Sequence, residues 1–134
     1  MDALVLARIF VCAFFAACFI QSGLDKVFDW KGNLDYLTGH FSKTFLRGQV
    51  KPMLGVVTAL EVVAGFSCAV SVFFIILNRP PVLPMLAMSL VCLDLIMLFA
   101  GQRIAKDYAG AGTLAIYFAV ALFGLNLMPG TIGG

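Results

Sequence analysis

Four long apolar runs constrain the fold of this chain more than any other feature. They extend from about Leu4 to Leu24, Met53 to Leu77, Val82 to Ala100 and Ala109 to Met128. A helix needs roughly 20 apolar residues to cross a bilayer, and each run meets or approaches that length. Only 12% of the residues are charged, against about a quarter in soluble domains. The sequence predicts an all-α integral membrane four-helix bundle, with residues 1–134 as one transmembrane domain.

The first run contains Phe15-Ala16-Ala17-Cys18, which loosely resembles a lipoprotein cleavage site. Its N-terminal region has few basic residues and holds Asp2, and apolar residues continue beyond Cys18, so we expect a retained helix. All the cysteines lie within apolar runs and none has CxxC spacing, which favours small packing residues over redox-active thiols. They are Cys12, Cys18, Cys68 and Cys92.

The segment from about Asp25 to Lys51 carries most of the charge and predicts an interfacial amphipathic helix, with Asn33 as its N-cap. Its apolar side is formed by residues at three- and four-residue steps, Leu34, Leu37, Phe41 and Phe45. Its polar side holds Asp35, His40, Lys43 and Arg47. The aromatic residues expected at the headgroup level are Phe28, Trp30 and Tyr36.

The basic residues predict the orientation of the chain. Asn78-Arg79-Pro80-Pro81 predicts a tight turn, because paired prolines cannot continue a helix. The long loop and the connection Gly101 to Tyr108 then share one side, with basic residues Lys26, Lys31, Lys43, Arg47, Lys51, Arg103 and Lys106. Only Arg8 and Arg79 lie on the other side, where Arg8 can extend to the headgroups. The positive-inside rule predicts that this multi-pass protein has its long loop in the cytoplasm and both termini outside.

Small residues at four-residue steps predict close helix contacts, and one such face could remain for a partner. They are Ala13/Ala17, Gly55/Ala59 and Ala111/Ala115/Ala119.

Glu61 and Asp94 lie inside apolar runs, where a carboxylate costs roughly 2.5 to 3.5 kcal/mol and usually faces a partner or a polar cavity. At 1.5 Å per residue, both lie within about 12 Å of the long-loop side, and Tyr117 comes at a similar depth. Gln21 lies near the end of the first run, with Lys26 beyond it. The sequence therefore predicts a polar layer in this half of the bundle.

Two interpretations of this layer stay open. In the functional one, a carboxylate relays protons or holds a headgroup, Tyr117 donates to a carbonyl and Lys26 is the counter-ion. In the structural one, Glu61 pairs with Lys26 or Arg103, and Asp94 pairs with Tyr117. Those pairs would only lock the helices together.

Several other functions find no support. His40 is the only histidine, so one chain cannot build a bis-histidine haem or a Ser/His/Asp triad, and no metal-ligand spacing is present. Gly110-x-Gly112-x-x-Ala115 lacks the strand and βαβ context of a dinucleotide site, so helix packing explains it better. Acidic residues interrupt the basic loop, which suits a headgroup-facing surface and not a nucleic-acid partner.

Two short motifs resemble the DoxX family of small four-span bacterial membrane proteins. They are Gln21-Ser22-Gly23-Leu24-Asp25-Lys26 at the end of the first run and Leu60-Glu61-Val62-Val63-Ala64-Gly65 in the second. The resemblance implies that Gly23, Lys26, Glu61 and Gly65 are motif positions. The family is named after the membrane subunit of a thiosulfate:quinone oxidoreductase, so the resemblance also implies a quinone-linked redox context.

The first functional hypothesis is therefore an accessory subunit of a larger bacterial respiratory-type complex. It would bind no cofactor alone, and its polar layer would shape a quinone or proton site beside other membrane subunits and lipids. The second hypothesis is a purely structural or assembly subunit, and the third is a small transporter. Glu61, Asp94, Lys26, Tyr117 and Gln21 are the candidate site residues.

Overall fold

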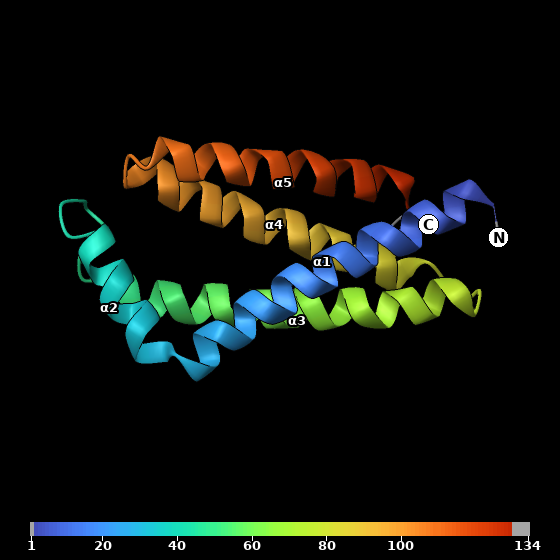
Figure 1. The fold of residues 1–134 in the computed structure, drawn as a ribbon, viewed down its shortest axis with the longest axis horizontal. Helices are drawn as coiled ribbons and strands as arrows, with labels where there is room; N and C mark the ends of the chain where they lie inside the picture. Colours follow the sequence, from blue (N-terminus) through green and yellow to red (C-terminus); the bar gives the residue numbers. More distant parts are fainter. Residues whose placement is uncertain (1, 130–134) are drawn as a thin grey trace.

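The computed structural model describes residues 2–129, and within that range it contains five α-helices and no strand. They are α1 (Ala3–Phe28), α2 (Trp30–His40), α3 (Val50–Ile76), α4 (Val82–Ile104) and α5 (Tyr108–Leu127). All but α2 are long and apolar enough to cross a membrane, and they form the elongated bundle of Figure 1. The predicted all-α four-helix architecture is confirmed.

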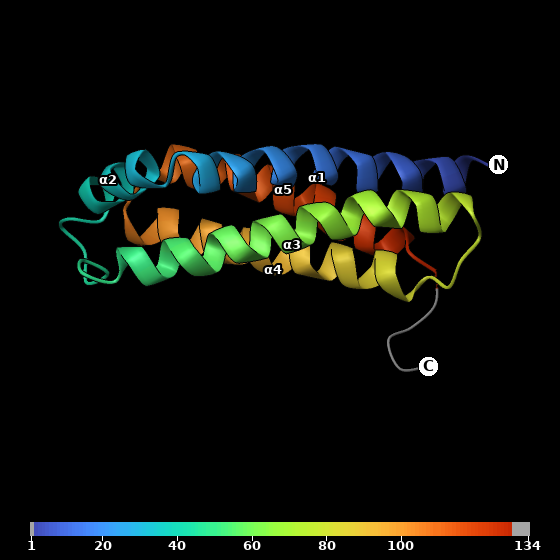
Figure 2. The same cartoon turned by 90° about the horizontal axis from the view of Figure 1, so that it is seen from below.

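The long helices form two pairs. In Figure 1, α1 crosses α3 while α4 and α5 run side by side, and Figure 2 shows the same bundle from below. Helix α1 packs mainly on α3, and α4 lies against both α3 and α5. At one end of the bundle lie α2, the segment 41–49 and the α4–α5 connection. We call this the α2 end; the start of α1 and the α3–α4 turn lie at the other.

Local chemistry explains where the helices begin and end. The Asp2 carboxylate accepts a hydrogen bond from the Val5 N–H at 2.9 Å, and Asp107 caps α5 by accepting from the Gly110 N–H at 3.0 Å. The predicted turn at 78–81 is present, with Asn78 in the left-handed region at φ 53°. Helices α1 and α4 each extend four residues beyond their apolar runs, because helix geometry continues through the polar residues that follow.

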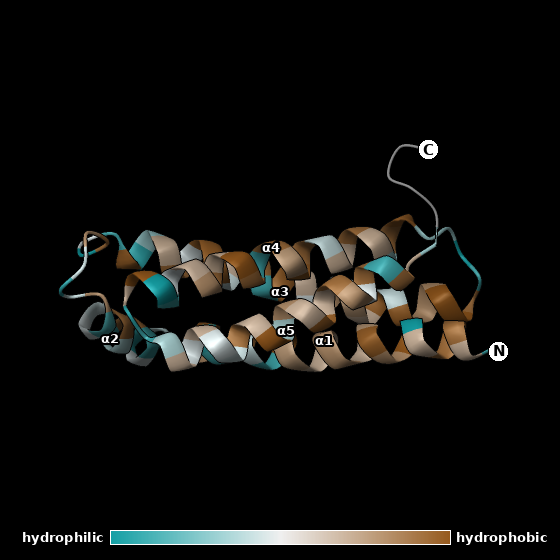
Figure 3. Ribbon diagram, turned by 90° about the horizontal axis from the view of Figure 1, so that it is seen from above, coloured by the Kyte–Doolittle hydropathy of each residue, from teal (hydrophilic) through white to brown (hydrophobic). Residues whose placement is uncertain are grey.

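The interior of the bundle is apolar, and α4 is its most enclosed helix. Phe15 of α1 packs with Met88, Val91 and Leu95 of α4 in one buried cluster. In α4, 44% of its apolar 18-residue stretch is buried inside the bundle, against 17% of the corresponding stretch in α5. Figure 3 shows the brown of apolar residues along much of the four long helices, with paler colours around α2. The exposed apolar side chains suit contact with lipid.

Two glycines lie where α1 and α3 pack closely. A Cβ atom on Gly65 would lie 2.7 Å from the backbone nitrogen of Ile20, and one on Gly23 would lie 2.8 Å from Val62 Cγ2. These two glycines let α1 cross close to α3. The predicted four-residue series is wrong for most of its members, because they lie on outward faces: Ala13, Ala17, Ala59, Ala115 and Ala119 are exposed, and Ala111 is buried.

The interfacial helix is present, although its limits differ from the prediction. Helix α2 starts at Trp30, so Asn33 is not its N-cap; the Asn33 amide donates to the Asp29 carbonyl oxygen at 2.9 Å. The helix ends at His40, and Phe45 lies beyond it with 79% of its surface exposed. The backbone of Asp29, at φ −122° and ψ 52°, is not helical, so α1 ends before it and α2 begins after it.

The polar layer as a candidate functional site

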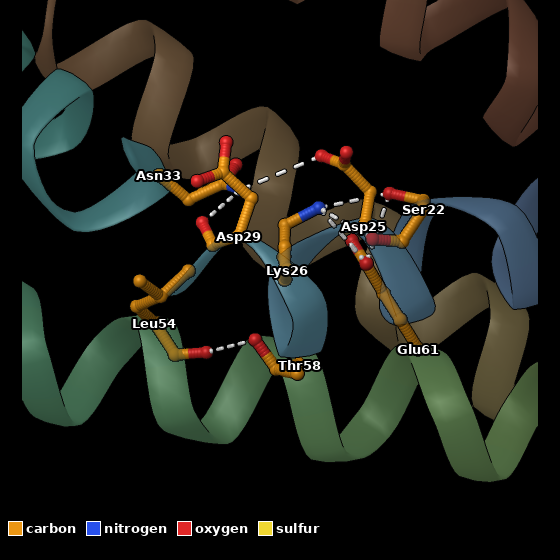
Figure 4. A network of polar contacts seen from close by, with 8 residues as sticks. All are labelled: Ser22, Asp25, Lys26, Asp29, Asn33, Leu54, Thr58 and Glu61. Atoms are coloured by element: carbon orange, nitrogen blue, oxygen red, sulfur yellow. Dashed lines mark hydrogen bonds and ion pairs between the residues drawn. The ribbon is translucent and has the colours of Figure 1, made fainter. Parts of the chain in front are cut away.

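Three polar side chains meet where α1 crosses α3. The Lys26 ammonium lies 3.0 Å from Glu61 Oε2 and donates to the Ser22 hydroxyl oxygen at 2.8 Å. The Ser22 hydroxyl donates in turn to the same Glu61 oxygen at 2.9 Å. Figure 4 shows the three side chains converging. We call this cluster the triad.

The sequence positions the triad through helix periodicity and close packing. Ser22 and Lys26 are four residues apart on α1 and therefore share one face. Gly23 lies between them against Val62, the neighbour of Glu61, so the two backbones approach closely. Only 1% of the Glu61 side chain is exposed, against 15% for Lys26. The triad thus encloses a carboxylate and leaves its cation near the helix end.

Asp94 presents the opposite situation on α4. Its surface is 0% exposed, and neither carboxylate oxygen has a hydrogen-bond partner among the described residues. It lies near the middle of its helix, about 18 Å from the Val82 end and about 15 Å from the Ile104 end. Asp94 therefore makes no hydrogen bond to the triad or to any other group of the described residues.

Two predicted members of the layer do not join it. The Tyr117 ring stacks on Phe14, with centroids 6.1 Å apart, so the predicted Asp94–Tyr117 pair is not formed. Gln21 is exposed, because its position on α1 faces away from α3. Arg103, the other proposed partner of Glu61, instead lies over the Tyr108 ring at 4.7 Å. Tyr117 was expected at a depth similar to that of Asp94, but the rotation of α5 places its ring on Phe14.

Two other polar contacts link helices. The Arg8 Nε donates to the carbonyl oxygen of Leu127 and ties α1 to the end of α5. His40 is partly buried, and its Nε2 lies 2.7 Å from Gln102 Oε1, which links α2 to α4. Sequence reasoning missed Gln102 and gave Ser22 no role. For Ser22, the spacing of four residues to Lys26 was the available signal.

The layer offers acid–base and hydrogen-bonding chemistry. In the described part of the chain, no three His, Cys, Asp or Glu side chains come together as metal ligands. The cysteines there are free thiols, and Cys12, Cys68 and Cys92 are buried. Asp94 can accept a proton or a hydrogen bond from a donor that enters the bundle.

Comparison of the chain with models of protein families, with curated proteins and with solved structures gives no match. The likeness to the DoxX family therefore rests on the two short motifs around Lys26 and Glu61. In the structure these motifs meet at the crossing of α1 and α3.

Proposed function

We propose that this chain is a small accessory subunit of a membrane redox complex, in which Asp94 handles protons or binds a quinone next to partner subunits. The carrying observation is that both Asp94 oxygens are buried without a hydrogen-bond partner in the described residues. A buried polar group without a partner costs roughly 1 to 3 kcal/mol, and more when charged. A function that requires Asp94 as a free hydrogen-bond acceptor explains why the protein keeps this unfavourable buried group.

The residues of the layer fit a ligand that carries hydroxyl or carbonyl oxygens. A quinol supplies two electrons and two protons on oxidation, and the electrons would pass to a cofactor of a partner subunit. Asp94 would accept a hydrogen bond from one hydroxyl group and then its proton, and the second proton would pass to an acceptor in the partner subunit. Lys26 and Glu61 would remain paired, holding α1 against α3 beside the site.

We also propose the bacterial cytoplasmic membrane as the location, with the α2 end in the cytoplasm. Lys31, Lys43, Arg47, Lys51 and Lys106 are all exposed at that end. The positive-inside rule supports this orientation.

The test is to replace Asp94→Asn in the native host and to purify the assembly in mild detergent. The proposal expects a co-purifying partner and normal assembly, with quinone-linked electron transfer lowered by roughly 10²- to 10⁴-fold, the usual contribution of a positioned acid or base. Ser89→Ala is a matched control on the same helix, because its hydroxyl only donates to the Met85 carbonyl oxygen. Isolation of the chain without any partner, or full electron transfer in Asp94→Asn, would reject the proposal.

The second candidate function is a purely structural subunit, and the triad is the observation that favours it. Lys26, Ser22 and Glu61 satisfy one another across two helices, as expected of an interhelical lock. On this alternative, Glu61→Gln would reduce the yield of assembled complex while turnover per assembled complex stays unchanged. The same measurement on Asp94→Asn separates the two functions.

A further inference from the structure

A hollow of about 600 Å³ lies at the α2 end, away from the polar layer. It is bounded on one side by the end of α2 and the segment that follows, including His40, Lys43 and Phe45. The end of α4 and the residues after it form the other side, including Ile104 and Lys106. Its volume is within the roughly 300 to 1,000 Å³ typical of small-molecule sites.

The lining of the hollow is cationic. It includes the residues Lys43 and Lys106 and no acidic residue. Neither ammonium group forms a salt bridge or hydrogen bond with the residues that the structure describes. The salt bridge among those residues is Lys26–Glu61, which lies outside the hollow. The hydroxyl hydrogens of Ser42 and Thr44 are already donated to the carbonyl oxygens of Gly39 and Phe41. Among the Lys, Ser and Thr side chains of the lining, the two ammonium groups are the free donors, which favours an anion.

Apolar side chains beside the ammonium groups indicate which kind of anion fits. Phe45 lines the hollow with 79% of its surface exposed. Ile104 is the last residue of α4, so the hollow opens where a membrane-spanning helix ends. A free ion would gain nothing from the exposed aromatic ring, whereas a lipid would bring acyl chains to it. We propose that the hollow binds the phosphate group of an anionic phospholipid, with Lys43 and Lys106 on the phosphate and Phe45 against the lipid.

Lys106 permits a test that separates binding from folding. Its backbone lies in the left-handed region, at φ 61°, where glycine is favoured over residues that carry a Cβ atom. Lys106→Gly therefore removes an ammonium group while relieving backbone strain. The site predicts lower lipid affinity in a variant that is at least as stable as the parent.

The experiment measures binding of phosphatidylglycerol to the full chain in detergent by native mass spectrometry, at fixed ionic strength. Lys43→Gln/Lys106→Gln should bind about ten- to thirty-fold more weakly, since each lysine near a lipid surface contributes roughly a three- to five-fold step in affinity. Lys106→Gly removes one of the two ammonium groups, so its loss of affinity should be about half that of the double variant on a logarithmic scale. The matched control is Lys31→Gln/Lys51→Gln, which removes two exposed charges outside this hollow and should retain parental affinity.

Two further probes complete the test. Phosphatidylcholine, which has no net charge, should bind equally weakly to all variants. Inorganic phosphate should not displace phosphatidylglycerol at equal concentration, because it lacks the apolar part. If both double variants lost affinity for phosphatidylglycerol equally, overall charge would explain the loss and the proposed site would be overturned. Displacement by inorganic phosphate would overturn the assignment to a lipid.

Discussion

The two buried acids of the bundle contrast sharply in how they are partnered. Glu61 has an ammonium group and a hydroxyl within 3.0 Å of one oxygen, whereas Asp94 has no hydrogen-bond partner in the described chain. Both lie near the middle of membrane-spanning helices and are almost fully enclosed. The sequence presents them alike, yet their surroundings suit different roles.

The difference teaches that depth in the membrane does not by itself mark a functional acid. A paired carboxylate can hold two helices together and needs no ligand. An unpaired one keeps the full desolvation cost, which lowers stability unless something else binds there. The following predictions test this contrast, beginning with the largest expected effect.

Removing the cation should be the most damaging change. Lys26→Met leaves Glu61 enclosed without its ammonium partner, and breaking one side of a buried pair costs roughly 3 to 5 kcal/mol. Unfolding in mixed micelles of increasing SDS content should show a loss of that size. The double variant Lys26→Met/Glu61→Leu should recover most of the stability; if it is no better than the single variant, the pair is not the source of the loss.

Separating the helices beneath the triad should have a smaller effect. Gly65→Ala places a Cβ atom 2.7 Å from the Ile20 backbone nitrogen, so α1 must move. Overpacking of this kind costs about 1 to 3 kcal/mol. The same unfolding assay applies, with Gly112→Ala on α5 as the control, because nothing lies within 4 Å of its added Cβ. Equal stability of the two variants would contradict the close crossing.

Asp94→Val should stabilise the protein, in contrast to changes in the triad. The replacement is apolar and removes two oxygens that lack partners in the described residues, for an expected gain of about 1 to 2 kcal/mol. The measurement is unfolding of the isolated chain in micelles, with Asp94→Asn alongside it as a near-isosteric control that keeps a polar group. A clear loss of stability in Asp94→Val would mean that Asp94 has a structural partner.

Ser22→Ala should have the smallest effect of the four. Lys26 still contacts Glu61 directly at 3.0 Å, so only the hydroxyl contacts disappear, at a cost of about 1 kcal/mol. Unfolding of this variant can be compared with Thr113→Ala, whose hydroxyl donates to the Ala109 carbonyl oxygen on an exposed face. A loss as large as that of Lys26→Met would show that Ser22, rather than the ion pair, holds Glu61.

The apolar runs were sufficient to predict the membrane-spanning helices, because length and hydrophobicity alone decide whether a segment can cross a bilayer. They could not predict which side chains of equal depth meet. Tyr117 and Asp94 were expected to pair, but rotation of α5 places Tyr117 on Phe14. The prediction of helix contacts from small residues failed for the same reason, since Ala13 and Ala17 share a face that points outward. Helix rotation depends on packing of the whole bundle, and glycines such as Gly65 reveal it only once the crossing is known.

The separation of Lys26 and Glu61 by 35 residues has a consequence for biogenesis. At about 5 to 20 residues per second, a ribosome would deliver the glutamate roughly two to seven seconds after the lysine. During that interval the first helix carries an unneutralised ammonium group. Because Lys26 lies two residues from the end of α1, its side chain can stay among the headgroups and move inward when α3 arrives. The interhelical ion pair can therefore form only after the second span has inserted beside the first.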